Sequence, residues 1–244
     1  MAGALNQSLG AVDATPVEDR ARSGRILDHG VYIVAEARRY AGVSDSTARS
    51  WLRGRSGRKA SAPLLHSDYE PCGKDFAISF LDLIDLFVAG RFRKAGVSMS
   101  VVRAAYESLG RELGTEHPFA HGELYLHGKR IIRAAASAVS HEVLCEVTSG
   151  QLFFRDLKAG LEKIDYGPVH RLAARWRIAE GVLIDPRVAM GKPTVQGTGT
   201  ATAVIASQYG ANGRDGALVA DLFGMSEQDV ANAVEFERAF GKAA

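Results

Sequence analysis

The side chains with the clearest chemical potential lie between residues 44 and 59. This stretch combines short hydroxyl side chains with arginines, and both kinds of group hydrogen-bond to the base edges and phosphates of nucleic acids. The candidates for base-edge contacts come first in the stretch: Ser46, Thr47, Arg49 and Ser50, with Ser44 just before them. The candidates for phosphate contacts follow: Arg53, Arg55, Arg58 and Lys59. The pattern indicates a surface that contacts DNA.

The distribution of charge agrees with this interpretation. Residues 20–59 hold ten Lys and Arg against three acidic residues, a local net charge of +7, although the whole chain has a formal net charge of only +2. The rest of the chain is therefore acidic on balance. A basic stretch alone is more often a solvated surface, but one that coincides with a DNA-binding pattern is the expected footprint of phosphate contact.

Nothing in the sequence is typical of an enzyme, a metal site or a cofactor site. His117, His121 and His127 are loosely spaced, and solvated or hydrogen-bonded histidines explain them better than metal ligation. Cys72 and Cys145 are isolated, which favours small hydrophobic side chains in a reducing cytoplasm over a disulfide or a zinc site. We therefore expect a cytoplasmic protein without enzyme activity, metal or cofactor.

Two helices are needed to position the polar stretch. The pattern predicts helices over 34–41 and 45–53, with Gly42 in the turn between them and Ser44 as the cap of the second helix. This is a helix-turn-helix, in which the second helix enters the major groove. Arg38 stands where a small residue usually lies at the helix crossing, so either the register is offset or Arg38 extends past the partner helix. The alternative is an ordinary two-helix corner with a solvated basic rim.

The rest of the chain has the composition of a folded protein. It is 46% hydrophobic and 24% charged, and no apolar run approaches the ~20 residues that span a bilayer, so we expect no membrane contact. The apolar periodicity predicts further helices over 80–90, from 98, 135–147, 152–164, 201–209, 215–222 and 226–239. It also predicts a hairpin over 124–132, a strand over 182–184 and a loop over 185–200.

The first half of the chain resembles the MerR-type winged helix-turn-helix. The resemblance lies in VYIVAEARRYAGVSDSTARSWLR (31–53) and FLDLIDLFVAGRFRKAGVSMSVVRAAYESL (80–109). It implies that the apolar helix and the helix after GVS pack behind the recognition unit. The coiled coil and cysteines of the metal-sensing members are missing here.

The last part of the chain, residues 181–237, resembles a bacterial domain family of unknown function. Its IDP, GKP and GT segments precede a second helix-turn-helix whose last helix ends in a V..A..FE pattern. Members commonly accompany PIN-domain toxins, so the whole chain resembles a VapB-type antitoxin. The family usually has an Arg after the Gly-Thr pair, where this chain has Gly199, which puts any contact of that Arg in doubt.

The last predicted helix is acidic and therefore unsuited to a major groove. It carries Glu227, Asp229, Glu235 and Glu237, so we expect this domain to serve dimerisation or toxin binding, or simply to cap the core. PIN-domain toxins of the family resembled hold metal with clustered acids, which implies a basic plug on the antitoxin. Arg238 and Lys242 are the candidates.

These inferences combine into one expectation. The fold is mainly α, with two winged helix-turn-helix-like domains and small β-hairpins. The predicted parts are a flexible leader (1–28), a MerR-like DNA-binding domain (29–134), a helical connector (135–178) and a C-terminal helix-turn-helix domain (179–244).

The predicted function is that of a homodimeric antitoxin that represses its own operator and neutralises a PIN-domain (VapC-type) endoribonuclease. Two-fold symmetry would place the DNA half-sites about 34 Å apart. The alternatives are a MerR-like regulator switched by a small effector, and an interaction adaptor whose basic stretch never contacts DNA.

Overall fold

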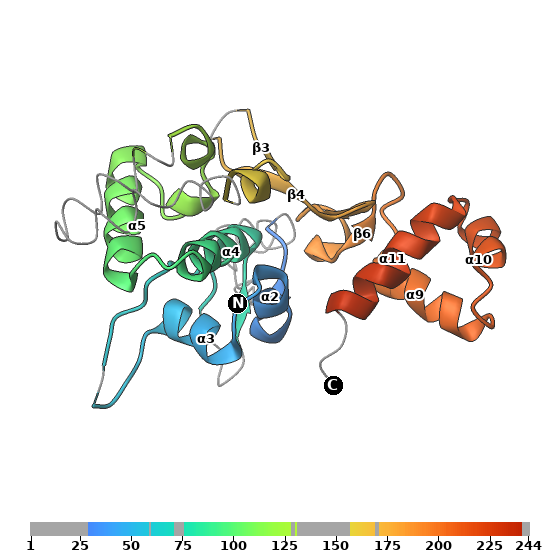
Figure 1. The fold of residues 1–244 in the computed structure, drawn as a ribbon, viewed down its shortest axis with the longest axis horizontal. Helices are drawn as coiled ribbons and strands as arrows, with labels where there is room; N and C mark the ends of the chain where they lie inside the picture. Colours follow the sequence, from blue (N-terminus) through green and yellow to red (C-terminus); the bar gives the residue numbers. More distant parts are fainter. Residues whose placement is uncertain are drawn as a thin grey trace, which may run out of the picture.

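A computed structural model describes residues 29–58, 60–70, 76–127, 130, 157–168 and 171–240 of the chain. Several predicted features lie outside these residues: the leader, the helix over 135–147, both cysteines, Lys59 and Lys242. The described part is mainly helical with small antiparallel sheets (Figure 1).

The first two helices agree with the predicted bounds. Strand β1 (Tyr32–Ile33) leads into α2 (Val34–Ala41), and α3 (Asp45–Arg53) follows after a short turn. Strand β2 (Ala77–Ile78) returns to pair antiparallel with β1, with Tyr32 opposite Ile78. This small sheet joins the start of α2 to the start of the next helix.

Helix α4 (Phe80–Lys94) is the centre of the first core. Ser79 and Asp82 form a reciprocal capping box at its start, and most of its residues are buried. It packs against α2, α5 (Met99–Leu113) and the 3₁₀ turn η1 (Pro118–Ala120) (Figure 1). Helix α4 extends beyond the predicted range of 80–90, and its last turn contains three basic residues.

A four-stranded antiparallel sheet follows, in the order β3 (Ile164–Tyr166), β4 (Ala173–Ala179), β5 (Val182–Ile184), β6 (Thr194–Val195). Only β5 was predicted as a strand. Residues 164–179 thus contain strands where we expected a helical connector, and only 157–161 of the expected 152–164 helix is described as helical. The predicted hairpin over 124–132 is also wrong at 124–127, which belong to a helical segment, and most of its remainder lies outside the described residues.

The C-terminal part is a three-helix unit beside this sheet. Helices α9 (Thr202–Ala211), α10 (Gly216–Phe223) and α11 (Glu227–Phe240) enclose a second small core, which includes Val195 of β6. The turn η2 (Ala189–Gly191) lies between β5 and β6. Within the described residues, none of the helices combines the length and apolar character that crossing a bilayer requires.

The C-terminal part also contacts α2 directly. The ring of Tyr40 lies 6.2 Å from that of Phe236 and 6.2 Å from that of Phe240, so the end of α11 packs against α2. Lys192 Nζ lies 2.7 and 2.9 Å from the carboxylate oxygens of Glu36. These contacts join the last third of the chain to the helix pair that carries the predicted DNA-binding residues.

Candidate nucleic-acid interface

Helix α3 presents one polar face to solvent because its other face is anchored in the core. Ala48, Trp51 and Leu52 are buried, and these positions lie on one side of the helix. Its start is fixed locally: Ser44 Oγ accepts a hydrogen bond from the Thr47 backbone N–H at 3.2 Å and donates one to Thr47 Oγ1 at 2.7 Å. The hydroxyls of Ser44 and Thr47 therefore form part of the cap of α3.

The turn between α2 and α3 depends on two glycines. Gly42 has φ +69°, the left-handed conformation that ends a helix sharply, and its N–H reaches the carbonyls of Arg38 and Arg39. Gly90 of α4 lies under the turn, where an added Cβ would come within 2.8 Å of Val43 Cγ1. The close approach of α4 holds the helix pair at a defined angle.

Arg38 does not offset the register of the helix pair. Its Nε lies 3.8 Å from Asp45 Oδ1, and its side chain is 29% exposed, so it extends past α3 instead of crossing into the core. Asp45 also accepts a hydrogen bond from Arg49 Nε at 2.7 Å. One carboxylate at the start of α3 thus orients two guanidinium groups.

The predicted basic and hydroxyl residues line one open groove of about 750 Å³. Its lining consists of residues of α3 and of the loop that follows: Ser46, Arg49, Ser50, Arg53, Gly54, Arg55 and Ser56. Arg55 Nε donates a hydrogen bond to Ser50 Oγ at 3.0 Å, which links the loop to the helix. The Arg53 guanidinium carbon lies 3.8 Å from the centre of the Phe76 ring, a cation–π contact that fixes its side chain.

The 55–61 loop projects from the body next to this groove (Figure 1). Its two arms are joined by the backbone hydrogen bonds Arg55 N–H to Ser61 O (2.8 Å) and Ser61 N–H to Arg55 O (3.0 Å). Gly54 allows the second arm to pass this close to the end of α3, since a Cβ at residue 54 would lie 2.3 Å from Ser61 O. Arg55 and Arg58 are both exposed on the loop.

The structure thus brings together most of the predicted DNA-contacting residues. Ser46, Arg49, Ser50, Arg53 and Arg55 share the groove, and Arg58 lies on the adjacent loop. Ser44 and Thr47 lie at the helix start, with their hydroxyls bonded to each other. Whether these residues contact DNA stays a prediction.

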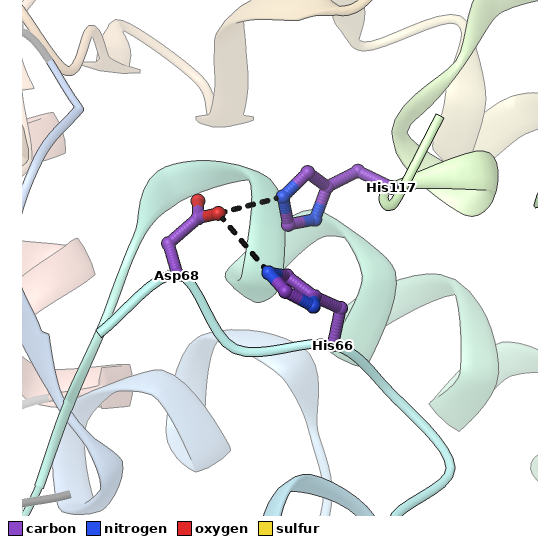
Figure 2. A group of neighbouring side chains, drawn as sticks. All are labelled: His66, Asp68 and His117. Carbon is purple, nitrogen blue, oxygen red and sulfur yellow. Dashed lines mark hydrogen bonds and ion pairs between the residues drawn. The ribbon is translucent and has the colours of Figure 1, made fainter. Parts of the chain in front are cut away.

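A cluster of histidines and aspartates, which includes the buried His117, Asp82 and Asp85, half-buried His66 and exposed Asp68, was not foreseen. His117 Nδ1 lies 3.1 Å from Asp85 Oδ2, and His117 Nε2 lies 3.0 Å from Asp68 Oδ1. His66 joins the cluster with its Nε2 at 3.6 Å from Asp68 Oδ1 (Figure 2). His121 and His127 are not part of it: His121 Nδ1 accepts from the Glu123 N–H, and His127 pairs with the Glu123 carboxylate.

Burial and charge act in opposite directions on the pKa values in this cluster. Burial disfavours the charged His117, but the hydrogen bonds to Asp68 and Asp85 outweigh it and raise the pKa of His117 to about 10. Burial would raise the pKa of Asp68, yet the hydrogen bonds to His117 and Ser79 lower it to about 2. Burial raises the pKa of Asp82 to about 7.

One sequence signal could have revealed the cluster. Asp82 and Asp85 interrupt the otherwise apolar run FLDLIDLFVAG, three residues apart and therefore on one face of α4. Acidic residues on the buried side of a helix require buried partners. The identity of those partners, His117 and the backbone of the segment that contains Asp68, is not visible in the sequence.

In the C-terminal part, the IDP and GKP segments have structural roles. Asp185 accepts hydrogen bonds from the Arg187 guanidinium at 3.0 and 2.9 Å. Burial alone would raise the pKa of Asp185, but the contacts with Arg187 lower it. Lys192 of GKP binds Glu36 of α2. Arg238 is exposed in the last turn of α11.

Comparisons with known proteins give a distant relative and a solved structure of similar fold. A curated protein of Mycobacterium tuberculosis (strain ATCC 25618 / H37Rv) named "Putative antitoxin VapB45" is 26% identical over an alignment of 228 positions, and the match covers 86% of this chain and 94% of that protein. The crystal structure of Rv2018 from Mycobacterium tuberculosis has the same fold, with a TM-score of 0.69, 24% identity, and coverage of 83% of this chain and 96% of that one. The chain matches no known protein-family profile.

Proposed function

We propose that this protein is an antitoxin that binds its own operator DNA through α3 and the 55–61 loop and neutralises a PIN-domain toxin. The antitoxin role rests on the distant relative named as an antitoxin, whose length the match covers almost completely. The DNA-binding role rests on the groove, because its lining gathers Arg49, Arg53 and Arg55 with three serines. Arg55 is exposed, whereas Arg49 and Arg53 are half-buried.

The arrangement suits a winged helix-turn-helix. In this interpretation α3 is the recognition helix, whose first turns reach base edges, and the 55–61 loop is a wing that contacts the backbone. The arginine side chains differ in how accessible they are to DNA. Arg55 and Arg58 are exposed, whereas Arg49 is hydrogen-bonded to Asp45 and would have to exchange this partner for a base edge. A base with two acceptors, such as guanine, is the natural replacement for a carboxylate.

The DNA part is tested by binding of the full chain to the DNA upstream of its own reading frame. We expect specific binding that Arg55→Ala weakens several-fold and Arg111→Ala leaves unchanged, since Arg111 is equally exposed but lies on α5. Fluorescence anisotropy against an unrelated duplex of equal length measures both. Equal affinity for the two duplexes would contradict an operator function and favour a non-specific binder or an adaptor.

The toxin part is tested with the PIN-type protein encoded next to this chain. We expect the full chain to form a complex with it and to block its ribonuclease activity. Arg238→Glu should weaken inhibition if Arg238 reaches the toxin's acidic site, while Arg214→Glu, an exposed arginine before α10, should not. A variant truncated within α11 is unsuitable, because Phe236 and Phe240 pack on Tyr40. Full inhibition by Arg238→Glu would exclude the plug, and absence of a complex would exclude the antitoxin function.

A further inference from the structure

The histidine–aspartate cluster brings three potential metal ligands together from two distant parts of the chain: half-buried His66, exposed Asp68 and buried His117. His66 and Asp68 lie on the segment after the 55–61 loop, and His117 directly precedes η1. One ligand atom from each of the three side chains lies within 4.8 Å of the other two. Figure 2 shows the two imidazole rings turned toward the same Asp68 oxygen.

We propose that His66, Asp68 and His117 bind a divalent transition-metal ion of the zinc class. In a tetrahedral zinc site with bonds of about 2.1 Å, neighbouring ligand atoms are about 3.4 Å apart. The distances from Asp68 Oδ1 to His117 Nε2 (3.0 Å) and to His66 Nε2 (3.6 Å) lie on either side of this value. Small side-chain rotations would complete the site.

The surroundings of His117 already match those of a metal ligand. Metal-binding histidines usually donate their second ring N–H to a carboxylate, which orients the ring. Here His117 Nδ1 lies 3.1 Å from Asp85 Oδ2, and Asp85 is itself held by the Tyr106 hydroxyl (3.0 Å) and the Ala120 N–H (2.9 Å). Its Nε2 is thereby directed toward Asp68 and the partly open side of the cluster.

Three carboxylates surround His117. Asp68, Asp82 and Asp85 all face His117, and the ion pairs that these three carboxylates form with described residues are with histidines alone. Asp82 is fully buried, and its Oδ1 accepts no hydrogen bond from the described residues. A cation held by His66, Asp68 and His117 would therefore lie in a site that acidic side chains surround.

The ligand set selects the class of metal. Two imidazoles and one carboxylate favour zinc and its neighbours over Mg²⁺ or Ca²⁺, which prefer oxygen ligands alone. Glu116 offers a fourth ligand, since its Oε2 lies 3.2 Å from His66 Nε2 and its side chain is mostly exposed.

A bound metal would tie the return arm of the 55–61 loop to the core. Leu64 and Leu65 donate backbone hydrogen bonds to Trp51 O at the end of α3, and His66 follows immediately. A metal that fixes His66 and Asp68 against His117 would thus restrain this arm beside α3. The site does not depend on the proposed function, because binding of the metal is measured without DNA or toxin.

The experiment is a titration of the chelator-treated full chain with Zn²⁺ by calorimetry, and with Co²⁺ by visible absorption. We expect one Zn²⁺ per chain and the intense d–d bands of tetrahedral Co²⁺. His66→Gln and Asp68→Asn should lower the affinity for Zn²⁺ by at least about 100-fold. Residues that coordinate the metal directly should matter more than the groups that orient them, whose loss costs about 10–100-fold. Asp85→Asn removes such an orienting group, so its loss of Zn²⁺ affinity should be about 10–100-fold. Mg²⁺ should not compete.

The control is His127→Gln, which removes a half-exposed histidine outside the cluster and should bind Zn²⁺ as the unaltered chain does. His66 is 36% exposed, so its substitution is compatible with folding, which circular dichroism verifies. The proposal is overturned if the unaltered chain binds no Zn²⁺, if His66→Gln and Asp68→Asn both retain full affinity, or if His127→Gln loses as much affinity as they do.

Discussion

At the scale of the residue, the arginines of the candidate interface differ in what already holds them. Arg49 is bonded to Asp45, Arg53 stacks on Phe76, and Arg55 is linked to Ser50. Such contacts reduce the number of conformations that a long side chain must give up on binding. These arginines are therefore held in place before any ligand arrives, whereas Arg58 lies on the exposed loop.

These differences predict distinct effects of two substitutions on DNA binding. Arg49→Ala should relax sequence preference, by about 1–3 kcal/mol at the base pair concerned, because Arg49 lies in the first turns of α3. Arg58→Ala should weaken binding to all sequences alike and reduce the slope of log affinity against log salt by about one. Salt titrations with operator and substituted duplexes measure both effects.

The same salt titrations can contradict these two assignments. If both variants lost affinity equally for every duplex with the same salt slope, the assignment of Arg49 to base edges would be wrong. If neither lost affinity, α3 and the 55–61 loop would not be the interface.

At the scale of the element, the 55–61 loop depends on the backbone of Gly54. This residue has φ +76° and ψ −169°, a region that is essentially restricted to glycine. It also lies where any Cβ would collide with the backbone of the returning arm, 2.3 Å from Ser61 O. The loop can therefore leave α3 and pair with itself only with glycine at this position.

We expect Gly54→Ala to separate the two arms of the loop and to destabilise the chain by about 1–3 kcal/mol. For a chain of this size, a loss of 1 kcal/mol lowers Tm by roughly 2–4 °C. DNA affinity should fall as well, because Arg55 and Arg58 lose their fixed positions. Thermal unfolding followed by circular dichroism measures the first effect.

The matched control is Gly210→Ala in α9, where an added Cβ meets no atom within 4 Å. Alanine is the better helix former, so this variant should be as stable as the unaltered chain or slightly more stable. An unchanged Tm for Gly54→Ala would show that the loop tolerates another path.

At the scale of the whole molecule, the C-terminal part is seated on α2, the first helix of the candidate DNA-binding pair. The contact combines the Lys192–Glu36 ion pair, the stacking of Tyr40 on the end of α11, and a hydrogen bond from the Val31 N–H to Met190 O. Gly191 permits the close approach, since a Cβ there would lie 2.3 Å from the Tyr32 hydroxyl. A partner that moves the C-terminal part would therefore act directly on α2.

A double-mutant cycle with Lys192→Met and Glu36→Gln should give a favourable coupling of at most about 1 kcal/mol, because both side chains are partly exposed to solvent. The reference is the same cycle on Lys158 and Glu162, a more exposed pair within one segment, where coupling should be smaller. Denaturant unfolding measures both cycles. Equal coupling in the two pairs would mean that the Lys192–Glu36 ion pair adds nothing specific to the contact between the C-terminal part and α2.

Local signals were sufficient to predict the helices at the two ends of the described chain. Helices α2 and α3 were predicted to the residue, because the signals that end and begin them, Gly42 and Ser44, act on neighbouring backbone groups. The three C-terminal helices were predicted within a residue or two for the same reason, with Asp215 and Gly224 at their ends. The surface of α3 followed from these bounds, since helical periodicity alone decides which of its residues share a face.

The features that join distant segments became visible only in the folded chain. Strands β3 and β4 carry mixed side chains. The pairing of β3 with β4, and of β4 with β5, makes them strands, not their periodicity. His117 reaches Asp68 across 49 residues, and Lys192 reaches Glu36 across 156. No local signal specifies such partners, because buried charges and sheet edges are satisfied by whichever groups the packing of the whole chain brings to them.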